Sequence, residues 1–74
     1  MNLLKHLIVK IESTEDVTDV YIEFMRKTEP YFIIEEKVFK VKLLADCYGR
    51  LGQYEMIWRE SEFIRHLELG YFMD

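Results

Sequence analysis

The residues that could do chemistry in this 74-residue chain are few: two histidines, one cysteine and the acidic side chains. Glu62 and His66 stand four positions apart, a spacing at which two side chains on one helix face can share a metal ion. His6 lies far away in the sequence, so the pair lacks the third ligand that a zinc site needs. We therefore interpret His66 as a solvated histidine beside a helical carboxylate, and predict no metal site.

Cys47 is the only thiol, and a reactive cysteine needs a depressed pKa. Arg50, three positions further on, is the only nearby base on its face, so we interpret Cys47 as a small buried hydrophobic residue. The sequence has no Ser-His-Asp set, glycine-rich phosphate loop, CxxC pair or paired-carboxylate arrangement. We predict that the protein is not an enzyme and that it binds no cofactor.

Composition narrows the function classes further. The net charge of −4 comes from 14 acidic and 10 basic residues that alternate along the chain, which argues against a nucleic-acid footprint. A single cysteine fits a reducing compartment, and no apolar run reaches the ~18 residues of a membrane span. We expect one cytoplasmic domain over residues 1–74, without a membrane segment.

The stretch Tyr31–Leu51 is apolar on two sides when it is read at helical spacing. One stripe contains Tyr31, Ile34, Val38, Val41, Ala45 and Tyr48, and the other contains Phe32, Phe39, Leu43 and Cys47. Such a helix must be covered on both sides, which predicts a central helix with the other elements packed around it. The alternation over residues 38–43 also fits a strand, but a hairpin with Glu35–Lys37 as its turn lacks residues that favour positive φ.

Three further helices are predicted around the central one. The first covers residues 2–11 with Asn2 as its cap, although the β-branched residues of 6–11 also fit a strand. The second starts at a capping box in residues 13–16, has one apolar face of Val17, Val20, Tyr21 and Phe24, and ends near Lys27. The last spans Gln53–Leu69, with Gly70 as the C′ residue. The predicted fold class is all-α, a bundle of about four helices.

Residues 44–69 resemble one tetratricopeptide repeat. Leu44, Ala45, Tyr48, Gly52, Tyr54, Ile57 and Ile64 stand where that family has its large, small and aromatic positions. The chain departs from the family at Ser61, at Ile57 and in the missing closing proline. The resemblance implies an antiparallel helical hairpin at the C-terminal end, and more weakly peptide binding.

The same segment allows a helix-turn-helix interpretation, because Ala45 and Gly49 have the four-residue offset of that motif. Arg59 and Arg65 would then lie on the recognition helix. Four glutamates crowd that helix and would meet the DNA phosphates, so we rank a DNA-binding regulator below the other functions.

An excess of apolar and aromatic residues in a small acidic chain predicts binding to another protein. Glu60 falls within an apolar arc and needs a cation, either from a Lys of the central helix or from a partner. We predict a partner-binding set of Tyr54, Trp58, Glu60, Tyr71, Phe72 and Met73. The hypothesis is an adaptor or inhibitor of a larger host protein, as phage and mobile elements often encode. The alternative is a structural homo-oligomer, such as a homodimer, whose apolar surface is its own interface.

Overall fold

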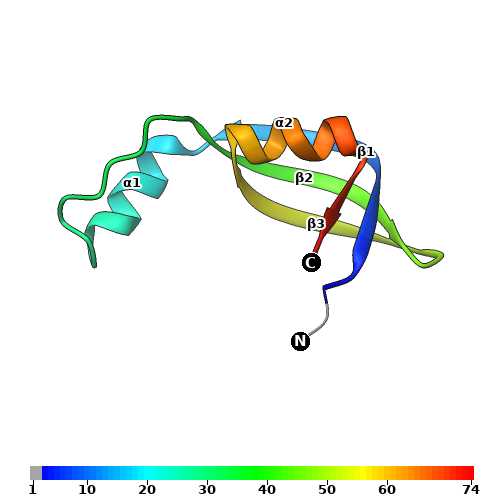
Figure 1. Cartoon of the computed structure of the whole chain (residues 1–74). Coiled ribbons are helices and arrows are strands. Elements are labelled where there is room, and N and C mark those ends of the chain that lie inside the picture. Colours follow the sequence, from blue (N-terminus) through cyan, green and yellow to red (C-terminus); the bar gives the residue numbers. More distant parts are fainter. Residues whose placement is uncertain (1–2) are drawn as a thin grey trace.

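A curled, four-stranded antiparallel sheet with two helices forms the fold in the computed structural model, which describes residues 3–74. Along the chain the elements are β1 (Lys5–Asp16), α1 (Thr18–Arg26), β2 (Val38–Cys47), β3 (Arg50–Arg59), α2 (Glu60–Leu69) and β4 (Tyr71–Met73). The strand order is β3-β2-β1-β4. Figure 1 shows α2 lying along the curled sheet, and α1 at the end away from the β2–β3 hairpin tip.

The predicted all-α bundle and its tetratricopeptide-like helical hairpin are wrong. Strands account for 49% of the described residues and helices for 26%, and the proposed central helix is a loop followed by β2 and the hairpin turn. Tyr31, which was to start that helix, is 94% exposed. The stripe failed as a guide because a strand with apolar residues on both faces also matches helical spacing. The predicted recognition helix of the helix-turn-helix interpretation is likewise divided between two elements: Arg59 ends strand β3, whereas Arg65 lies in helix α2.

The β2–β3 hairpin turns at Tyr48 and Gly49, not at Glu35–Lys37. Its register runs without interruption from Val38 opposite Arg59 to Cys47 opposite Arg50. Tyr48 and Gly49 have φ values of 52° and 86°, the two positive angles that a two-residue type I′ turn requires. Gly49 adopts that conformation freely, whereas Tyr48 does so against the strain of its Cβ.

The core lies on the concave face of the sheet, where alternate residues of β2 point. Val41, Leu43 and Ala45 are completely buried there, and the ring of Trp58 on β3 is buried beside them. Phe72 on β4 completes the cluster. A period of two over residues 41–45 therefore places alternate residues of β2 in the core, whereas Val38, at the start of the strand, is buried on the other face.

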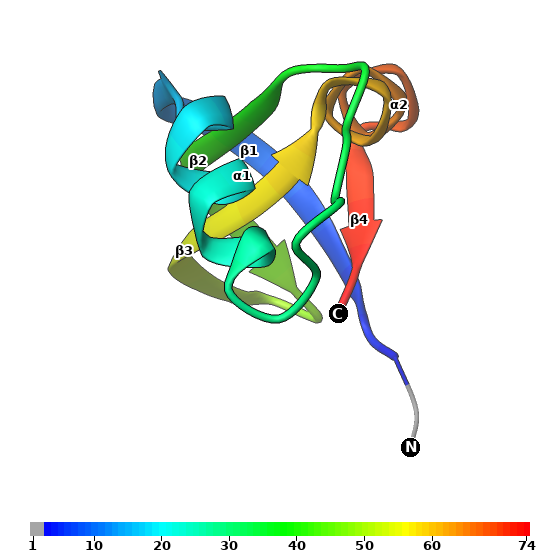
Figure 2. The same cartoon turned by 90° about the vertical axis from the view of Figure 1, so that its left-hand side faces the viewer.

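The N-terminal segment is strand β1, not the predicted helix over residues 2–11; the expected cap at Asn2 lies outside the described residues. β1 pairs with β2 along most of its length and with β4 near its start. Its register with β2 shifts at two places, between Ile8 and Lys10 and between Ile11 and Ser13. Such bulges bend and twist a strand, which accounts for the curl that Figure 2 shows along the sheet.

Helix α2 starts at Glu60, seven residues later than the predicted Gln53, but it ends where the sequence indicated. Gly70 has a φ of 78°, and its N–H donates to the His66 carbonyl at 2.8 Å, so the predicted C′ role of Gly70 is confirmed. At the other end, a Glu36 carboxylate oxygen accepts from the Ser61 N–H at 2.8 Å. That hydrogen bond lowers the pKa of Glu36 and ties the loop before β2 to the start of α2.

Helix α1 begins at Thr18, later than the predicted start at residues 13–16, and projects from the end of the sheet (Figure 1). Two hydrogen bonds attach its base to β2: the Val38 N–H donates to the Thr18 hydroxyl at 3.0 Å, and the Val17 N–H donates to the Val38 carbonyl at 2.9 Å. Asp16 accepts from the Thr18 N–H and hydroxyl, and these hydrogen bonds lower its pKa. None of the nine α1 residues, all of them described, is buried.

Candidate functional site

The residues predicted to bind a partner are distributed over different environments. Trp58 and Phe72 are 4% and 1% exposed and belong to the core. Tyr54 is half-buried on the same face, with its ring centroid 5.0 Å from that of His6. The side chains of Trp58 and Phe72 are therefore unavailable to a partner in this conformation.

The other three predicted residues lie nearer the surface but do not form one patch with the first three. Glu60 occupies the first turn of α2, where its N–H donates to the Lys37 carbonyl at 2.8 Å. Tyr71 is half-buried beneath the Lys5 ammonium, which lies 4.2 Å from its ring centroid. Met73 is 48% exposed at the end of β4.

Both histidines face the aromatic core, which no motif or spacing in the sequence indicated. His6 is 5% exposed and stacks on Phe72 at 5.0 Å, and its Nδ1 lies 2.9 Å from the Leu4 carbonyl oxygen. A carbonyl only accepts, so Nδ1 must carry the proton in this contact. The His66 ring lies 4.4 Å from Trp58, so the interpretation of His66 as solvated is wrong.

The environment of the His66 ring predicts a loss of stability in mild acid. Its buried Nδ1 has no hydrogen-bond partner among the described residues, and burial lowers its pKa, a shift that the Glu62 charge opposes only in part. Because the unfolded chain takes up this proton more readily, stability is full above the ordinary histidine pKa of about 6.5 and falls as the pH drops through and below it.

We expect the free energy of unfolding, measured with urea, to fall between about pH 7.5 and about pH 5.5. In a His66→Phe variant, which keeps a ring against Trp58, this fall should be smaller. The window lies above the pH at which the lowered carboxylate pKa values of Asp16 and Glu36 matter, because they cost stability only as the pH falls toward and below 4. An unchanged pH dependence in the variant would contradict the role of His66.

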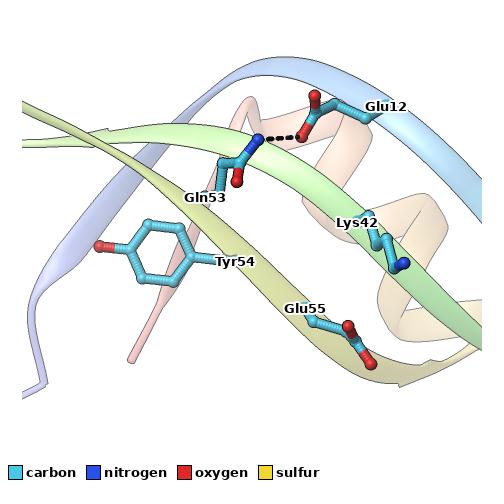
Figure 3. A pocket seen from close by; sticks show the side chains of 5 residues that line it. All are labelled: Glu12, Lys42, Gln53, Tyr54 and Glu55. Carbon is cyan, nitrogen blue, oxygen red and sulfur yellow. Dashed lines mark hydrogen bonds between the residues drawn. The ribbon is translucent and has the colours of Figure 1, made fainter.

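A polar hollow lies on the convex side of the sheet, and Figure 3 shows five residues that line it. The Gln53 amide donates to Glu12 at 3.4 Å across β2, and Glu55 accepts from Lys40 at 3.0 Å. The first of these contacts is long, and both are made by side chains that water also solvates. Neither contact desolvates a side chain or forces it into a strained conformation. We find no arrangement for acid–base or nucleophilic chemistry in this hollow.

An apolar groove runs between α1 and the convex face of the sheet. Its volume is about 400 Å³, and its lining comprises Val17, Val20, Tyr21 and Phe24 of the α1 segment with Glu15, Lys40, Glu55 and Ile57 of the three strands. Val20 and Phe24 remain 67% and 66% exposed although they stand on the apolar face of an amphipathic helix. The groove is therefore a concave surface with a largely apolar lining that lies outside the core.

Three charged side chains, Glu15, Lys40 and Glu55, line the groove beside its apolar residues. The Lys40 ammonium is hydrogen-bonded to Glu55, which raises the pKa of Lys40, and Glu15 adds to the same effect from β1. Two carboxylates therefore stand beside one ammonium, and the charged part of the lining is net acidic. The sequence had identified Val17, Val20, Tyr21 and Phe24 as one apolar face. The structure leaves Val20 and Phe24 of this stripe open, whereas Val17 and Tyr21 are half-buried and the Tyr21 ring packs edge-on against Phe32 at 5.8 Å.

Residues 3–74 contain no group of three His, Cys, Asp or Glu side chains placed to hold a metal ion. Neither described helix has the length and apolar character needed to cross a membrane. No family model, no curated protein and no solved structure matches this chain.

Proposed function

We propose that this chain is a non-catalytic protein-binding module whose partner docks in the groove between α1 and the sheet. The observation that carries this proposal is an amphipathic helix on which Val20 and Phe24, two residues of the apolar stripe, are left exposed. Exposed apolar surface on a small monomer is unfavourable in water, and when it is contiguous and concave it marks a binding site. Phe24 and Tyr21 supply the large rings that dominate interface energetics.

The groove also indicates what the partner presents. Its apolar lining residues favour apolar side chains, and its two carboxylates beside one ammonium favour Lys or Arg next to them, in keeping with the net charge of −4. We propose a segment of a larger protein that carries apolar residues with basic neighbours. A cytoplasmic location and a host-cell partner belong to the same proposal, and the free thiol of Cys47 is consistent with a reducing compartment.

The test is capture of partners from a cell lysate by the tagged chain and two matched variants. Phe24→Glu places a charge in the groove, whereas Ile64→Glu makes the same change at a residue of α2 that is 50% exposed. We expect Phe24→Glu to reduce recovery of the partner at least about tenfold and Ile64→Glu to leave it unchanged. Equal recovery of the same partner by both folded variants would refute the groove as the site.

A homo-oligomer is the second candidate function, and a different feature favours it. Strand β3 lies at one edge of the sheet and is ten residues long. Such an edge can pair with an edge of another copy through its backbone N–H and C=O groups.

A further inference from the structure

The free edge of β3 is an interaction surface distinct from the groove. Within residues 3–74, β3 has a neighbouring strand on one side only, and its pairing with β2 contains no bulge. It also contains no proline, whereas the edge strand on the other side, β4, has only three residues. Proteins usually shorten, bulge or cover a long edge, because its unpaired N–H and C=O groups pair readily with another strand.

The hairpin turn determines which backbone groups face that edge. A two-residue turn is closed by a hydrogen-bonded pair, here Cys47 and Arg50, and hydrogen-bonded pairs then recur at every second residue. The N–H and C=O groups of the residues between them point outward. These are Leu51, Gln53, Glu55 and Ile57, whose side chains lie on the convex face of the sheet.

We propose that two copies of this chain form a symmetric dimer by antiparallel pairing of their β3 strands, centred on Tyr54. In this register Leu51 of each copy faces Ile57 of the other, and Gln53 faces Glu55. Leu51 and Ile57 are 64% and 51% exposed in the single chain, so the pairing covers two otherwise solvated aliphatic pairs. The glutamine amide can donate to the glutamate, and about eight backbone hydrogen bonds form across the axis.

The concave face is equally complementary in this register. Gly52 of one copy faces Met56 of the other, so that a long flexible side chain lies opposite a residue without one. The two Tyr54 residues meet at the axis. Each Tyr54 ring already leans over its own Gly52, where an added Cβ would approach the ring to 3.2 Å.

The two neighbouring registers of the β3 pairing place less favourable side chains opposite each other. A shift centred on Glu55 places two carboxylates directly opposite each other and Leu51 opposite Arg59. A shift centred on Gln53 places Leu51 opposite Glu55 and leaves Ile57 opposite the turn at Gly49. Two like charges that face each other directly repel and destabilise the pairing, and an apolar side chain opposite a charged one gains no favourable contact. The register centred on Tyr54 is therefore the most stable of the three.

The dimer extends beyond the proposed function and does not depend on it. It nevertheless affects the groove, because Ile57 lines the groove and Leu51 of the second copy comes to lie beside Ile57. The open side of each groove would then be bounded by the other chain. A dimer of this kind presents two such grooves, related by the two-fold axis.

Sedimentation of the wild-type chain is the first test. At a concentration on the order of 100 µM we expect a dimer that dissociates on dilution, as suits an interface of micromolar affinity. A monomer at that concentration would overturn the proposal. This measurement needs no substitution, so it stands even if a variant fails to fold.

Disulfide trapping tests the register. In a Cys47→Ala background, which removes the native thiol, one chain carries Gln53→Cys and another carries Glu55→Cys. These positions form a hydrogen-bonded pair across the proposed axis, with Cα atoms about 5.5 Å apart, a distance that a disulfide spans. With oxidised glutathione, we expect the mixed chains to cross-link as a heterodimer at least about tenfold more than either variant alone.

Self-cross-linking of either single variant in preference to the mixture would overturn the Tyr54-centred register. The two proposals also fail separately. A monomeric chain that still captures a partner through Phe24 would refute the proposed dimer and support the groove as a binding site. A cross-linked dimer without Phe24-dependent capture would support the dimer and refute the groove.

Discussion

Replacing Phe72 by Ala is expected to lower the free energy of unfolding by about 3–5 kcal/mol. The ring is 1% exposed and lies between both histidines, with centroids 5.0 Å from His6 and 6.2 Å from His66. It also makes edge contacts with Trp58 at 5.3 Å and with Tyr54 at 6.0 Å. Its removal therefore leaves a cavity bordered by four rings that cannot easily close around it.

The consequence of this loss for folding is large because the domain is small. A chain this small has a total stability near the lower end of the 5–15 kcal/mol that is usual for folded domains, so the variant should be largely unfolded or melt about 15 °C lower. Urea unfolding followed by circular dichroism measures the free energy of unfolding, and thermal unfolding measures the melting temperature.

Met73→Ala is the matched control, because it truncates the neighbouring residue of the same strand, which is 48% exposed. It should cost less than about 1 kcal/mol. If Phe72→Ala proved as mild as Met73→Ala, then Phe72 would not belong to the core, and the earlier prediction that it binds a partner would regain its basis.

Val41→Asn is expected to destabilise the protein by about 3 kcal/mol. Val41 is completely buried in the centre of β2, between β1 and β3. The substitution removes an aliphatic side chain from the core and leaves an amide without hydrogen-bond partners, and each change costs about 1–3 kcal/mol. Urea unfolding at neutral pH gives the difference directly.

Lys42→Asn tests the same strand one residue further on. Lys42 points to the convex face opposite Glu55 and is exposed, so the same asparagine there should change stability by less than about 1 kcal/mol. A strand alternates between faces at each residue, and the contrast between positions 41 and 42 reports this period. Similar costs at the two positions would contradict the arrangement of β2 with one face buried.

Some features of this protein follow from its sequence alone. The glycine at position 70 predicted where α2 ends. The helical spacing of four apolar residues predicted an amphipathic helix near α1, and these residues are Val17, Val20, Tyr21 and Phe24. Both depend on local chemistry: a glycine that accepts positive φ, and apolar residues on one side of a helical turn. Whether each residue of the stripe faces the sheet or solvent is not a local property, and tertiary structure decided it.

The identity of β2 and β3 was decided by tertiary structure. Val38, Val41 and Ala45 fit a helix stripe as well as the buried positions of a strand, so periodicity over residues 38–45 could not distinguish the two. The distinction came from partners far away in the sequence: β1 pairs with β2 across more than twenty residues, and Phe72 reaches the core only because β4 pairs beside β1. Backbone hydrogen bonds in a sheet are made between segments, whereas those of a helix are made within one segment. The residue pattern of a single segment therefore does not show which distant strand will form hydrogen bonds with its backbone.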